Sequence, residues 1–473
     1  MVDYEKLGFK AGLECHQQLD TKKLFCNCPS LVNDQNPNFA EIKRKLTVTE
    51  GELGKKDVAA EFEAKKQKIS IYQAKETSSC LVELDEEPPH PLNQEALKIA
   101  LQIAFMVNAK IVPEVQVMRK IVVDGSNVSG FQRTALIARN GYIETSKGKV
   151  GIPTIYLEEE AAKKIEETET TVTYSLDRLG IPLIELSTSP DLKDPEQVQE
   201  AASLIGMIFR STEKVKRGIG SIRQDVNLSI KDHPRIELKG FQDLRSIPKV
   251  IENEIERMQK EKDRISHVRK VEPNLASSFL RPMPGSSRLY PETDIPHIKI
   301  TKQMTEQIKI PELITERAVN VERKYNISPQ YAREIIKYNI PFDYYTEKYK
   351  IDPKIIAHTL LEIPKEIQRR YKTEKKPKKG DFETVFSLLE KKQIQREAVI
   401  EILQGILEGK KPDLDRYSTE DLSTLEEFIK DLVNKNKGVS ASGLMGDVMK
   451  KYRGKVDGAF VLELIKKYQR DTE

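Results

Sequence analysis

The sequence predicts an α+β protein in which a mixed α/β domain is followed by all-helical domains. Strand and helix patterns are mixed over the first 300 residues, whereas from about residue 303 onward only helical periodicity remains. A chain of 473 residues corresponds to about three domains at roughly 150 residues each. We therefore predict a mixed domain at 1–302, a helical domain at 303–410 and a small helical tail at 411–473.

Three helices of the mixed domain can be located from their caps and periodicity. Asp194 and Pro195 read as an N-cap and a first helical position, and apolar residues then recur at intervals of three and four up to Val215. The same pattern follows Ser246, and a broadly apolar segment over 93–108 begins after Asn93. Beyond the mixed domain, residues 381–410 and 419–473 are predicted to be helical.

Composition excludes several classes of protein. Hydrophobic residues make up 38% and charged residues 32% of the chain, which is typical of a soluble globular protein. No apolar run reaches the roughly 18 residues of a membrane span, and the N-terminus has no apolar signal core. Four cysteines are too few for a disulfide scaffold. We expect a reducing, cytoplasmic location and no membrane contact.

Positive charge is concentrated in one short segment. The formal net charge of the whole chain is only +4, yet 365–380 contains eight Lys and Arg against two Glu. A basic segment on a nearly neutral protein favours contact with a polyanion. The alternative is a solvated linker.

The first candidate site lies in GLECHQQLD, where apolar and polar residues alternate. Glu14 and His16 are two residues apart and therefore project from the same face of a strand, opposite Cys15, which we expect in the core. A carboxylate beside an imidazole is half of a metal site. The alternative is an ordinary Glu–His contact on an exposed strand.

Two further acidic positions follow apolar strands. Glu185 interrupts the run Ile181–Leu186, so this carboxylate is expected to be buried and to need a cation or a basic side chain as its partner. Glu158 begins three adjacent acids at the end of the strand in TIYLEEEA. Such a run is usually solvated. Together with His16, however, Glu158 and Glu185 would form an oxygen-rich site suited to Mg²⁺ or Mn²⁺.

A hairpin is predicted where SIRQDVNLSI and RIELKG flank Asp-His-Pro. The alternation leaves one polar face on each strand. These faces carry Arg223, Asp225, Asn227, Arg235, Glu237 and Lys239. The sequence contains no phosphate-binding loop of the GxxxxGK[ST] type, no GxGxxG after a strand and no HExxH. Cations for phosphate beside acids for magnesium would replace such a loop, whereas the alternative is a solvated hairpin face.

The cysteines suggest an incomplete zinc pattern. Cys26 and Cys28 form a CxC pair, and Cys80 follows at a distance. Either Glu83 or His90 could supply a fourth ligand. The alternative is three unrelated thiols.

Taken together, these blocks resemble a known family. GLECHQQLDTKKLFCNC, LVELDEEPPHPLN, SGFQRTALIARNG, YLEEEA, LGIPLIELSTSPD, SIRQDVNLSI, RIELKG and RLYPETDIP resemble, in this order, the E subunit of archaeal glutamyl-tRNA(Gln) amidotransferase. Looser versions occur in the bacterial B subunit. LMGDVMKKYRGKVDGAFVLELI resembles the YqeY-type tail of both. The resemblance covers nearly the whole chain.

The resemblance implies a fold and an activity. The mixed domain would be a cradle holding the active site, followed by a helical domain and by a tail that binds tRNA(Gln). ATP would phosphorylate the side-chain carboxyl of glutamate on Glu-tRNA(Gln), and ammonia would displace the phosphate to give Gln-tRNA(Gln). The ammonia would come from the D subunit, an asparaginase-like partner, in a heterotetramer of two D and two E subunits.

The resemblance also assigns residues. It places the family's magnesium ligands at His16, Glu158 and Glu185, with Glu14 beside them. The hairpin residues match blocks that line the family's cradle, so Lys239 or Arg223 would contact phosphate, and Glu237 or Asp225 would contact the metal or the glutamyl ester. In the tail, we expect Lys450, Lys451, Arg453 and Lys455 to contact tRNA phosphates.

The chain departs from the family pattern at two places. In the bacterial B subunit, CxC is followed by CxxC, whereas Glu83 stands at the last of these positions here. The E subunit normally carries, before its RPxPG segment, a domain similar to one in bacterial aspartyl-tRNA synthetase, but HVRKVEPNLASSFLRPMPG is continuous here. Two other functions stay open: a bacterial-type B subunit that also serves Asp-tRNA(Asn), and a tRNA-binding module without catalysis.

Overall fold

The computed structural model divides the chain into two compact units, Met1–Leu313 and Ile314–Glu473. It describes every residue except 1, 34, 36, 46, 48–53, 55, 57, 123, 262, 264, 284–288, 413–421, 437, 453–457 and 471–473. The first unit extends past the predicted boundary at 303 and includes α5 (Lys302–Glu306). The boundary predicted at 411 adjoins residues outside the described part of the chain and stays a prediction.

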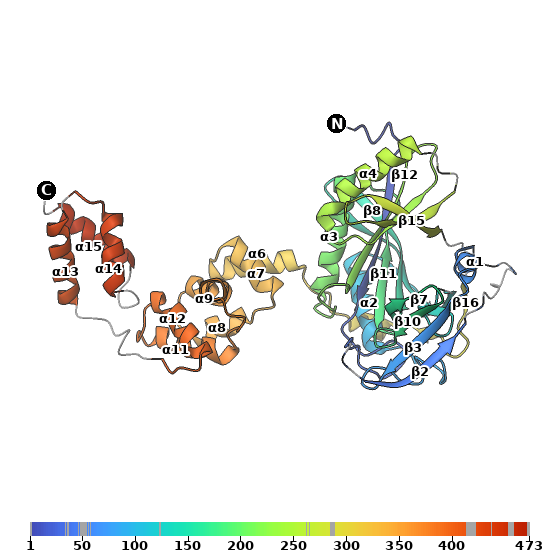
Figure 1. Cartoon of the computed structure of the whole chain (residues 1–473), viewed down its shortest axis with the longest axis horizontal. Helices are drawn as coiled ribbons and strands as arrows, with labels where there is room; N and C mark the ends of the chain where they lie inside the picture. Colours follow the sequence, from blue (N-terminus) through green and yellow to red (C-terminus); the bar gives the residue numbers. More distant parts are fainter. Residues whose placement is uncertain are drawn as a thin grey trace. The chain divides into compact units, whose positions relative to one another are not determined.

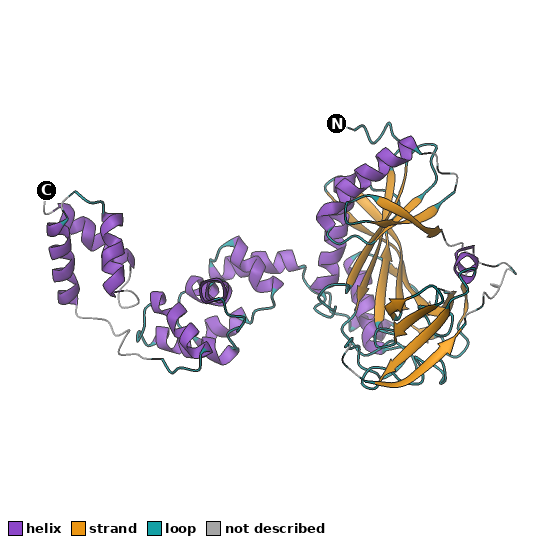
Figure 2. Cartoon of the chain, viewed as in Figure 1, coloured by secondary structure: helices purple, strands orange, loops and turns teal. Residues whose placement is uncertain are grey.

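The first unit is built on one large, mostly antiparallel sheet (Figures 1 and 2). Its strands follow in the order β15 (Ser277–Pro282), β14 (His267–Val271), β13 (Ile236–Lys239), β12 (Ile222–Ser229), β1 (Lys10–Gln18), β11 (Pro182–Ser187), β8 (Gly148–Glu159), β7 (Phe131–Thr145), β6 (Val117–Ile121) and β16 (Leu289–Pro291), and β4 (Lys110–Ile111) pairs with β7. Among these pairs, β13 and β14 run parallel. The strand β1 is therefore internal and has a hydrogen-bonded neighbour on each side.

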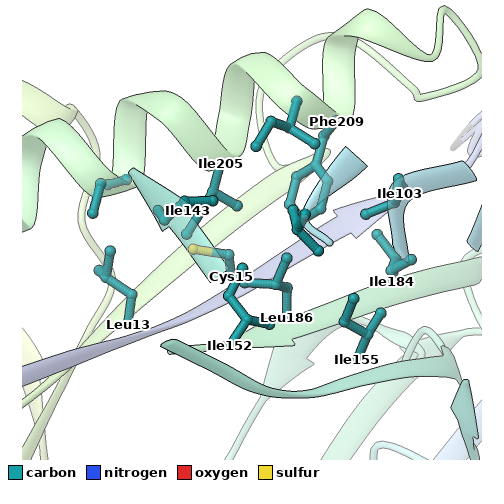
Figure 3. Close-up of a cluster of buried hydrophobic side chains, with 14 of the residues drawn as sticks. Leu13, Cys15, Ile103, Ile143, Ile152, Ile155, Ile184, Leu186, Ile205 and Phe209 are labelled. Carbon is teal, nitrogen blue, oxygen red and sulfur yellow. The ribbon is translucent and has the colours of Figure 1, made fainter. Parts of the chain in front are cut away.

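Helices cover one face of this sheet. They are α2 (Gln94–Met106), α3 (Pro195–Ser211) and α4 (Ile247–Lys260) (Figure 1). Leu13 and Cys15 of β1 point toward this layer and pack with Ile205 and Phe209 of α3 (Figure 3). Because side chains alternate along a strand, Glu14 and His16 point to the opposite face. Core packing on one side of β1 thus fixes where its polar side chains go.

A four-stranded sheet and a short helix complete the first unit on the side away from these helices (Figure 2). A four-stranded sheet has the order β2 (Asn38–Arg44), β3 (Ile69–Lys75), β10 (Thr171–Ser175) and β9 (Lys163–Glu167). The short helix α1 (Val58–Ala64) packs against β15. A two-stranded ribbon joins β5 (Glu114–Val115) to β17 (Ile298–Lys299).

The second unit is helical throughout its described residues. Its helices are α6 (Ile314–Tyr325), α7 (Pro329–Lys337), α8 (Phe342–Lys348), α9 (Pro353–Leu361), α10 (Ile363–Tyr371), α11 (Lys379–Glu390), α12 (Val399–Leu407), α13 (Leu422–Lys435), α14 (Ala441–Tyr452) and α15 (Gly458–Arg470). The last three share a hydrophobic cluster of their own, which includes Ile429, Val448 and Ile465. No helix in the described part of the chain is long and apolar enough to cross a bilayer.

The predicted α+β class is confirmed, and the cap signals located three helices correctly. The Asp194 side chain accepts a hydrogen bond from Gln197 N at the start of α3, and Asn93 accepts from the backbone at the start of α2. Ser246 precedes α4, as expected, but makes no side-chain cap there. Asp243 instead caps a preceding 3₁₀ turn, Leu244–Ser246, which leads into α4.

Candidate active site

A cavity of about 360 Å³ lies on the face of the large sheet opposite the packed face of β1. The pairing register of β1 with its two neighbouring strands explains which side chains meet in this cavity. His16 pairs with Glu185 of β11 on one side and with Arg223 of β12 on the other, and Glu14 pairs with Asp225. The acidic chamber, as we call this cavity, is lined by Glu14, His16, Lys120, Gln132, Glu158, Arg223, Asp225, Glu237, Lys239 and Arg281, among others.

Three predicted ligands converge on one point. Oxygen or nitrogen atoms of His16, Glu158 and Glu185 lie within 4.8 Å of one another, and all three residues are buried. The His16 Nε2 atom lies 3.4 Å from Glu185 Oε2 and 3.3 Å from Glu14 Oε1. A second group, formed by Glu14, His16 and Asp225, is equally compact. The structure therefore brings together the four residues predicted to carry out catalysis.

Lys120 of β6 provides a cation for the buried acids. Its Nζ atom lies 2.5 Å from Glu158 Oε1 and 3.6 Å from Glu185 Oε2. Thr134 Oγ1 donates to Glu158 Oε1 at 2.6 Å, and Gln132 Nε2 donates to Glu158 Oε2 at 3.2 Å. The expectation that Glu185 needs a partner is met by both Lys120 and His16.

The two buried carboxylates have opposite pKa shifts. Burial, reinforced by the charge of Glu185, raises the pKa of Glu158 above its ordinary value. Burial acts in the same direction on Glu185, but Lys120 and His16 outweigh it and lower the pKa of that carboxyl. Burial alone would lower the pKa of His16, yet its hydrogen bond and charge interactions with Glu185 raise it. Divergent values in one cluster are typical of functional sites.

The hairpin contributes a second group of charges. Lys239 Nζ lies 2.5 Å from both Asp225 Oδ2 and Glu237 Oε1, and these two acids raise its pKa despite its burial. Arg223 Nη2 donates to Glu160 Oε1 at 3.1 Å. Two predicted hairpin residues are placed elsewhere. Asn227 and Arg235 do not line the chamber, and the Arg235 guanidinium contacts Met283 Sδ.

The chamber has the donor set that a magnesium ion needs. Carboxylate oxygens surround a single imidazole, and the Nδ1 atom of His16 is buried without a hydrogen-bond partner among the described residues. Mg²⁺ prefers carboxylate oxygens and keeps open positions for water and substrate phosphates. The residues His16, Glu158 and Glu185, with Glu14 beside them, therefore fit such an ion.

The cysteine cluster is also assembled. Ligand atoms of Cys26, Cys28, Cys80 and Glu83 lie within 4.8 Å of one another. Hydrogen bonds from Cys26 and Cys80 lower the pKa of Cys28 to about 4, which favours the metal-binding thiolate. The Cys26 thiol donates to Glu83 Oε1 at 2.9 Å. Of the two proposed fourth ligands, Glu83 joins the cluster, whereas His90 contacts Glu87 instead. Three thiols and one carboxylate fit a tetrahedral zinc ion.

The basic residues predicted in the tail are only partly described. Lys450 is 81% exposed and pairs with Asp447, and Lys451 lies over the Phe428 ring at 4.4 Å from its centre. Arg453 and Lys455 lie outside the described residues.

Sequence reasoning missed Lys120, Gln132, Thr134 and Arg281. None belongs to an acidic motif or to the hairpin. They reach the chamber because β6 and β7 continue the sheet beyond β8 and because β15 closes its other end. In RTALIA, Arg133 and Thr134 are adjacent and only apolar residues follow, so periodicity does not indicate the face on which Thr134 lies. No local pattern distinguishes Lys120 from an ordinary surface lysine.

Two family models match this chain. One, described as the GatB/GatE catalytic domain, matches residues 9–306, and the other, described as a GatB domain, matches residues 341–468. The chain belongs to the GatB/GatE amidotransferase family. The first match contains every chamber residue named above.

The curated relatives include the E subunit of glutamyl-tRNA(Gln) amidotransferase from three archaea. The Methanocaldococcus jannaschii protein is 36% identical over 98% of this chain and 99% of its own length. The Methanosarcina acetivorans protein is 35% identical over 98% of each chain, and the Archaeoglobus fulgidus protein is 33% identical over 99% of each. The predicted membership in this family, on its archaeal GatE side, is thereby confirmed.

The alignments also bear on the missing insertion. The alignment with the Methanocaldococcus protein runs over 624 positions, whereas this chain has 473 residues, so at least 151 positions have no counterpart here (624 minus 473). In this chain, β14 is followed directly by β15, with the two strands paired as a hairpin.

Proposed function

We propose that this chain converts Glu-tRNA(Gln) into Gln-tRNA(Gln) in an ATP-dependent reaction. The γ-phosphoryl group of ATP passes to a side-chain carboxylate oxygen of the glutamyl group, leaving ADP and an acyl phosphate. Ammonia then attacks the acyl carbon, the carbon–oxygen bond to phosphate breaks, and phosphate and a proton leave. The products are Gln-tRNA(Gln), ADP and phosphate.

One observation carries this proposal: buried acids share the acidic chamber with partly buried cations. Burying the charges of Glu158 and Glu185 costs several kcal/mol unless they are paired or bound to metal. Apolar residues of similar size would fill a purely structural role at a lower cost in free energy. The pairing of acids for a metal ion with cations for phosphate is what phosphoryl transfer requires. This favours catalysis over a purely tRNA-binding module.

The chamber residues can be given roles on this basis. His16, Glu158 and Glu185 would hold Mg²⁺. When bound, the ion would supply positive charge that stabilises the charge developing on the transferred phosphate. Lys239 and Arg223 would bind the transferred phosphate, and Asp225 and Glu237 would orient Lys239. Burial raises the pKa of Glu14, which suits that carboxylate to accept a proton from ammonium.

Ammonia is proposed to come from the D subunit, in an assembly of two D and two E subunits. The cysteines do not provide a glutaminase nucleophile. Burial raises the pKa of the Cys15 thiol, which lies in the core, and the other three cysteines form the cluster with Glu83. High ammonium should therefore support amidation by this chain alone. Glutamine hydrolysis by the isolated chain would contradict this division of labour.

The decisive experiment measures ATP hydrolysis and Gln-tRNA(Gln) formation together. The chain is incubated with ATP, Mg²⁺ and Glu-tRNA(Gln), with ammonium or with glutamine and the D subunit. We expect ATP turnover that depends on charged tRNA, and no reaction with uncharged tRNA(Gln). Binding without turnover would support the non-catalytic module, and comparable activity on Asp-tRNA(Asn) would support the alternative of a bacterial-type B subunit.

We also infer that Cys26, Cys28, Cys80 and Glu83 bind zinc. Elemental analysis of the purified chain should give about one zinc per chain, because three thiols and a carboxylate complete a tetrahedral site. Cys28→Ser should lower the zinc content, whereas Cys15→Ser, in the core, should retain it. Equal zinc content in both variants would contradict this inference.

A further inference from the structure

A second hollow continues from the acidic chamber. It has a volume of about 300 Å³ and lies among α1, the start of β3, β9, β10 and β15. Glu63, Asp124, Ser126 and Arg281 line both spaces, so the hollow and the chamber adjoin. We call this hollow the basic annex. Its charged lining residues are Lys45, Glu63, Lys66, Lys68, Asp124, Lys164, Glu167, Arg178 and Arg281.

The two spaces have opposite charge balance. Among the described residues lining the chamber, six acids face four Lys and Arg, whereas six Lys and Arg line the annex against three acids. An excess of acids attracts divalent cations, and an excess of cations attracts polyanions. The change of sign occurs over a short distance, because four residues are common to both linings.

Some annex cations are already engaged. Lys68 and Lys164 each lie 2.7 Å from oxygens of Glu167, and Lys164 and Lys68 together lower the pKa of that carboxyl to about 2. Lys66 lies 2.6 Å from Glu63. These contacts still leave an excess of positive charge, because one carboxylate serves two lysines.

Two other cations are placed differently. Within the described residues, Lys45 and Arg281 form no ion pair. Lys45 follows β2 and is exposed, and Arg281 lies on β15 at the junction of annex and chamber. A cation without an acidic partner is the group best able to exchange water for phosphate. These two side chains therefore carry the argument.

The annex wall also offers apolar surface. Leu280, next to Arg281 on the edge strand β15, lines the annex and is 43% exposed. Grooves that bind single-stranded nucleic acid combine cations, which follow the phosphates, with side chains against which bases pack. The combination of an exposed apolar side chain and unpaired cations matches that pattern.

We propose that the basic annex binds the phosphates of the unpaired 3′ end of the tRNA substrate. The aminoacyl group on the terminal ribose would then reach the acidic chamber beside Arg281. This proposal rests on the proposed function and adds the path of the substrate to it. The annex is better matched to an RNA backbone than to ATP, because the acids that would hold a metal-bound triphosphate lie in the chamber.

The test compares two double variants with the same change in net charge. Lys45→Ala/Arg281→Ala removes the annex cations. Lys10→Ala/Lys299→Ala removes two exposed cations that do not line the annex or chamber. Binding to the full chain is measured with tRNA(Gln) carrying its unpaired 3′ nucleotides and with tRNA(Gln) lacking them. Thermal denaturation checks that each variant is folded.

We expect the annex variant to weaken binding of complete tRNA several-fold and to leave binding of the shortened tRNA unchanged. For complete tRNA, the slope of the logarithm of the binding constant against the logarithm of salt concentration should become shallower by about 1.4. Each of the two lost single-strand phosphate contacts contributes about 0.7 to that slope. The matched control should change both tRNAs equally. The KM for ATP, measured in the presence of Glu-tRNA(Gln), should be unaltered in the matched control and in the single variant Lys45→Ala, because Lys45 lines the annex but not the chamber.

Three results would overturn the proposal. Equal weakening with complete and shortened tRNA would place the contact elsewhere on the tRNA, and unchanged binding of both would show that the annex cations are only solvated. A raised KM for ATP with normal tRNA binding would make the annex a nucleotide site. Binding does not require turnover. A chain that shows no activity, but whose tRNA binding through the annex cations depends on the 3′ nucleotides, would therefore contradict the proposed function while supporting the annex proposal.

Discussion

The two units of this protein place their charged side chains in different environments. In the first unit, Glu158 and Glu185 are buried, and Lys120 Nζ lies 2.5 Å from Glu158 Oε1 and 3.6 Å from Glu185 Oε2. In the second unit, charged side chains such as Lys365 and Lys450 are at least half exposed. Burial makes a charge sensitive to its exact neighbours, whereas exposure leaves it screened by water and salt. The first arrangement suits chemistry and the second suits reversible binding of a polyanion.

The sharpest test of this comparison is Glu185→Gln. The substitution keeps the shape of the side chain but removes a charge that His16 and Lys120 contact. We expect the rate of Gln-tRNA(Gln) formation at saturating tRNA to fall on the order of 10²- to 10³-fold, as when other transition-state contacts are lost. The dissociation constant for tRNA should hardly change. His16→Ala should act in the same direction but more mildly, because water can replace one ligand.

Glu144→Gln is the matched control for Glu185→Gln. Glu144 lies on the same sheet, is 66% exposed at its side chain and contacts Lys149 at 3.6 Å. This variant should retain full activity. Near-normal turnover of Glu185→Gln at ordinary Mg²⁺ would make Glu185 a structural acid only.

Deleting residues 411–473 should have the opposite profile. The KM for Glu-tRNA(Gln) should rise and its salt dependence should flatten, by up to about 3.6 in log–log slope if all four predicted basic residues contact duplex phosphates. The rate at saturating tRNA should be retained, because every chamber residue lies in the first unit. An unchanged KM and salt slope would remove the tail from the tRNA-binding surface.

A buried charge outside the chamber should matter for stability rather than turnover. The Glu292 side chain is fully buried, with Arg119 Nη2 at 2.5 Å and Arg133 Nε at 2.8 Å. Although burial opposes it, hydrogen bonding to Arg119 lowers the pKa of Glu292 from 4.5 to about 2. Glu292→Gln should therefore cost about 3 kcal/mol of unfolding free energy at pH 7, at 1.36 kcal/mol per unit.

The pH dependence of that cost has a definite sign. Because the folded pKa of Glu292 is depressed, its contribution is complete above pH 4.5 and is lost as pH falls toward about 2. The difference in melting temperature between wild type and Glu292→Gln should shrink over that window. A difference that stays constant between pH 7 and pH 3 would show that lost packing, not ionisation, causes the effect.

The smallest effect is expected at an exposed pair of the second unit. Lys365 Nζ lies 2.7 Å from Glu334 Oε2 and 2.9 Å from Glu362 Oε1, but the Lys365 side chain is 50% exposed. Solvent screens such contacts, so Lys365→Ala should change unfolding free energy by no more than about 1 kcal/mol. Thermal denaturation of Lys365→Ala and wild type in low and high salt measures this change in unfolding free energy. A loss as large as that of Glu292→Gln would break the distinction between the two units.

The sequence predicted most of what local periodicity controls. Alternation placed Cys15 in the core and His16 on the other face, and the apolar run around Glu185 required a partner for that acid. The hairpin is confirmed by the pairing of Asn227 with Glu237. Sheet order was beyond this reasoning. Lys120 and Arg281 reach the site through pairings between distant segments, and Asn227 and Arg235 fall beyond the chamber although they share its polar faces.

The strand β1 serves two purposes at once, and this restricts how it can change. Its odd-numbered residues from Ala11 to Cys15 fill the core, and its even-numbered residues Glu14 and His16 face the chamber. Inserting or deleting one residue within β1 would exchange the two faces. In a scan of all substitutions, the cause of intolerance should alternate along this strand with a period of two. Odd positions would be limited by protein abundance, and positions 14 and 16 by turnover in protein that accumulates normally.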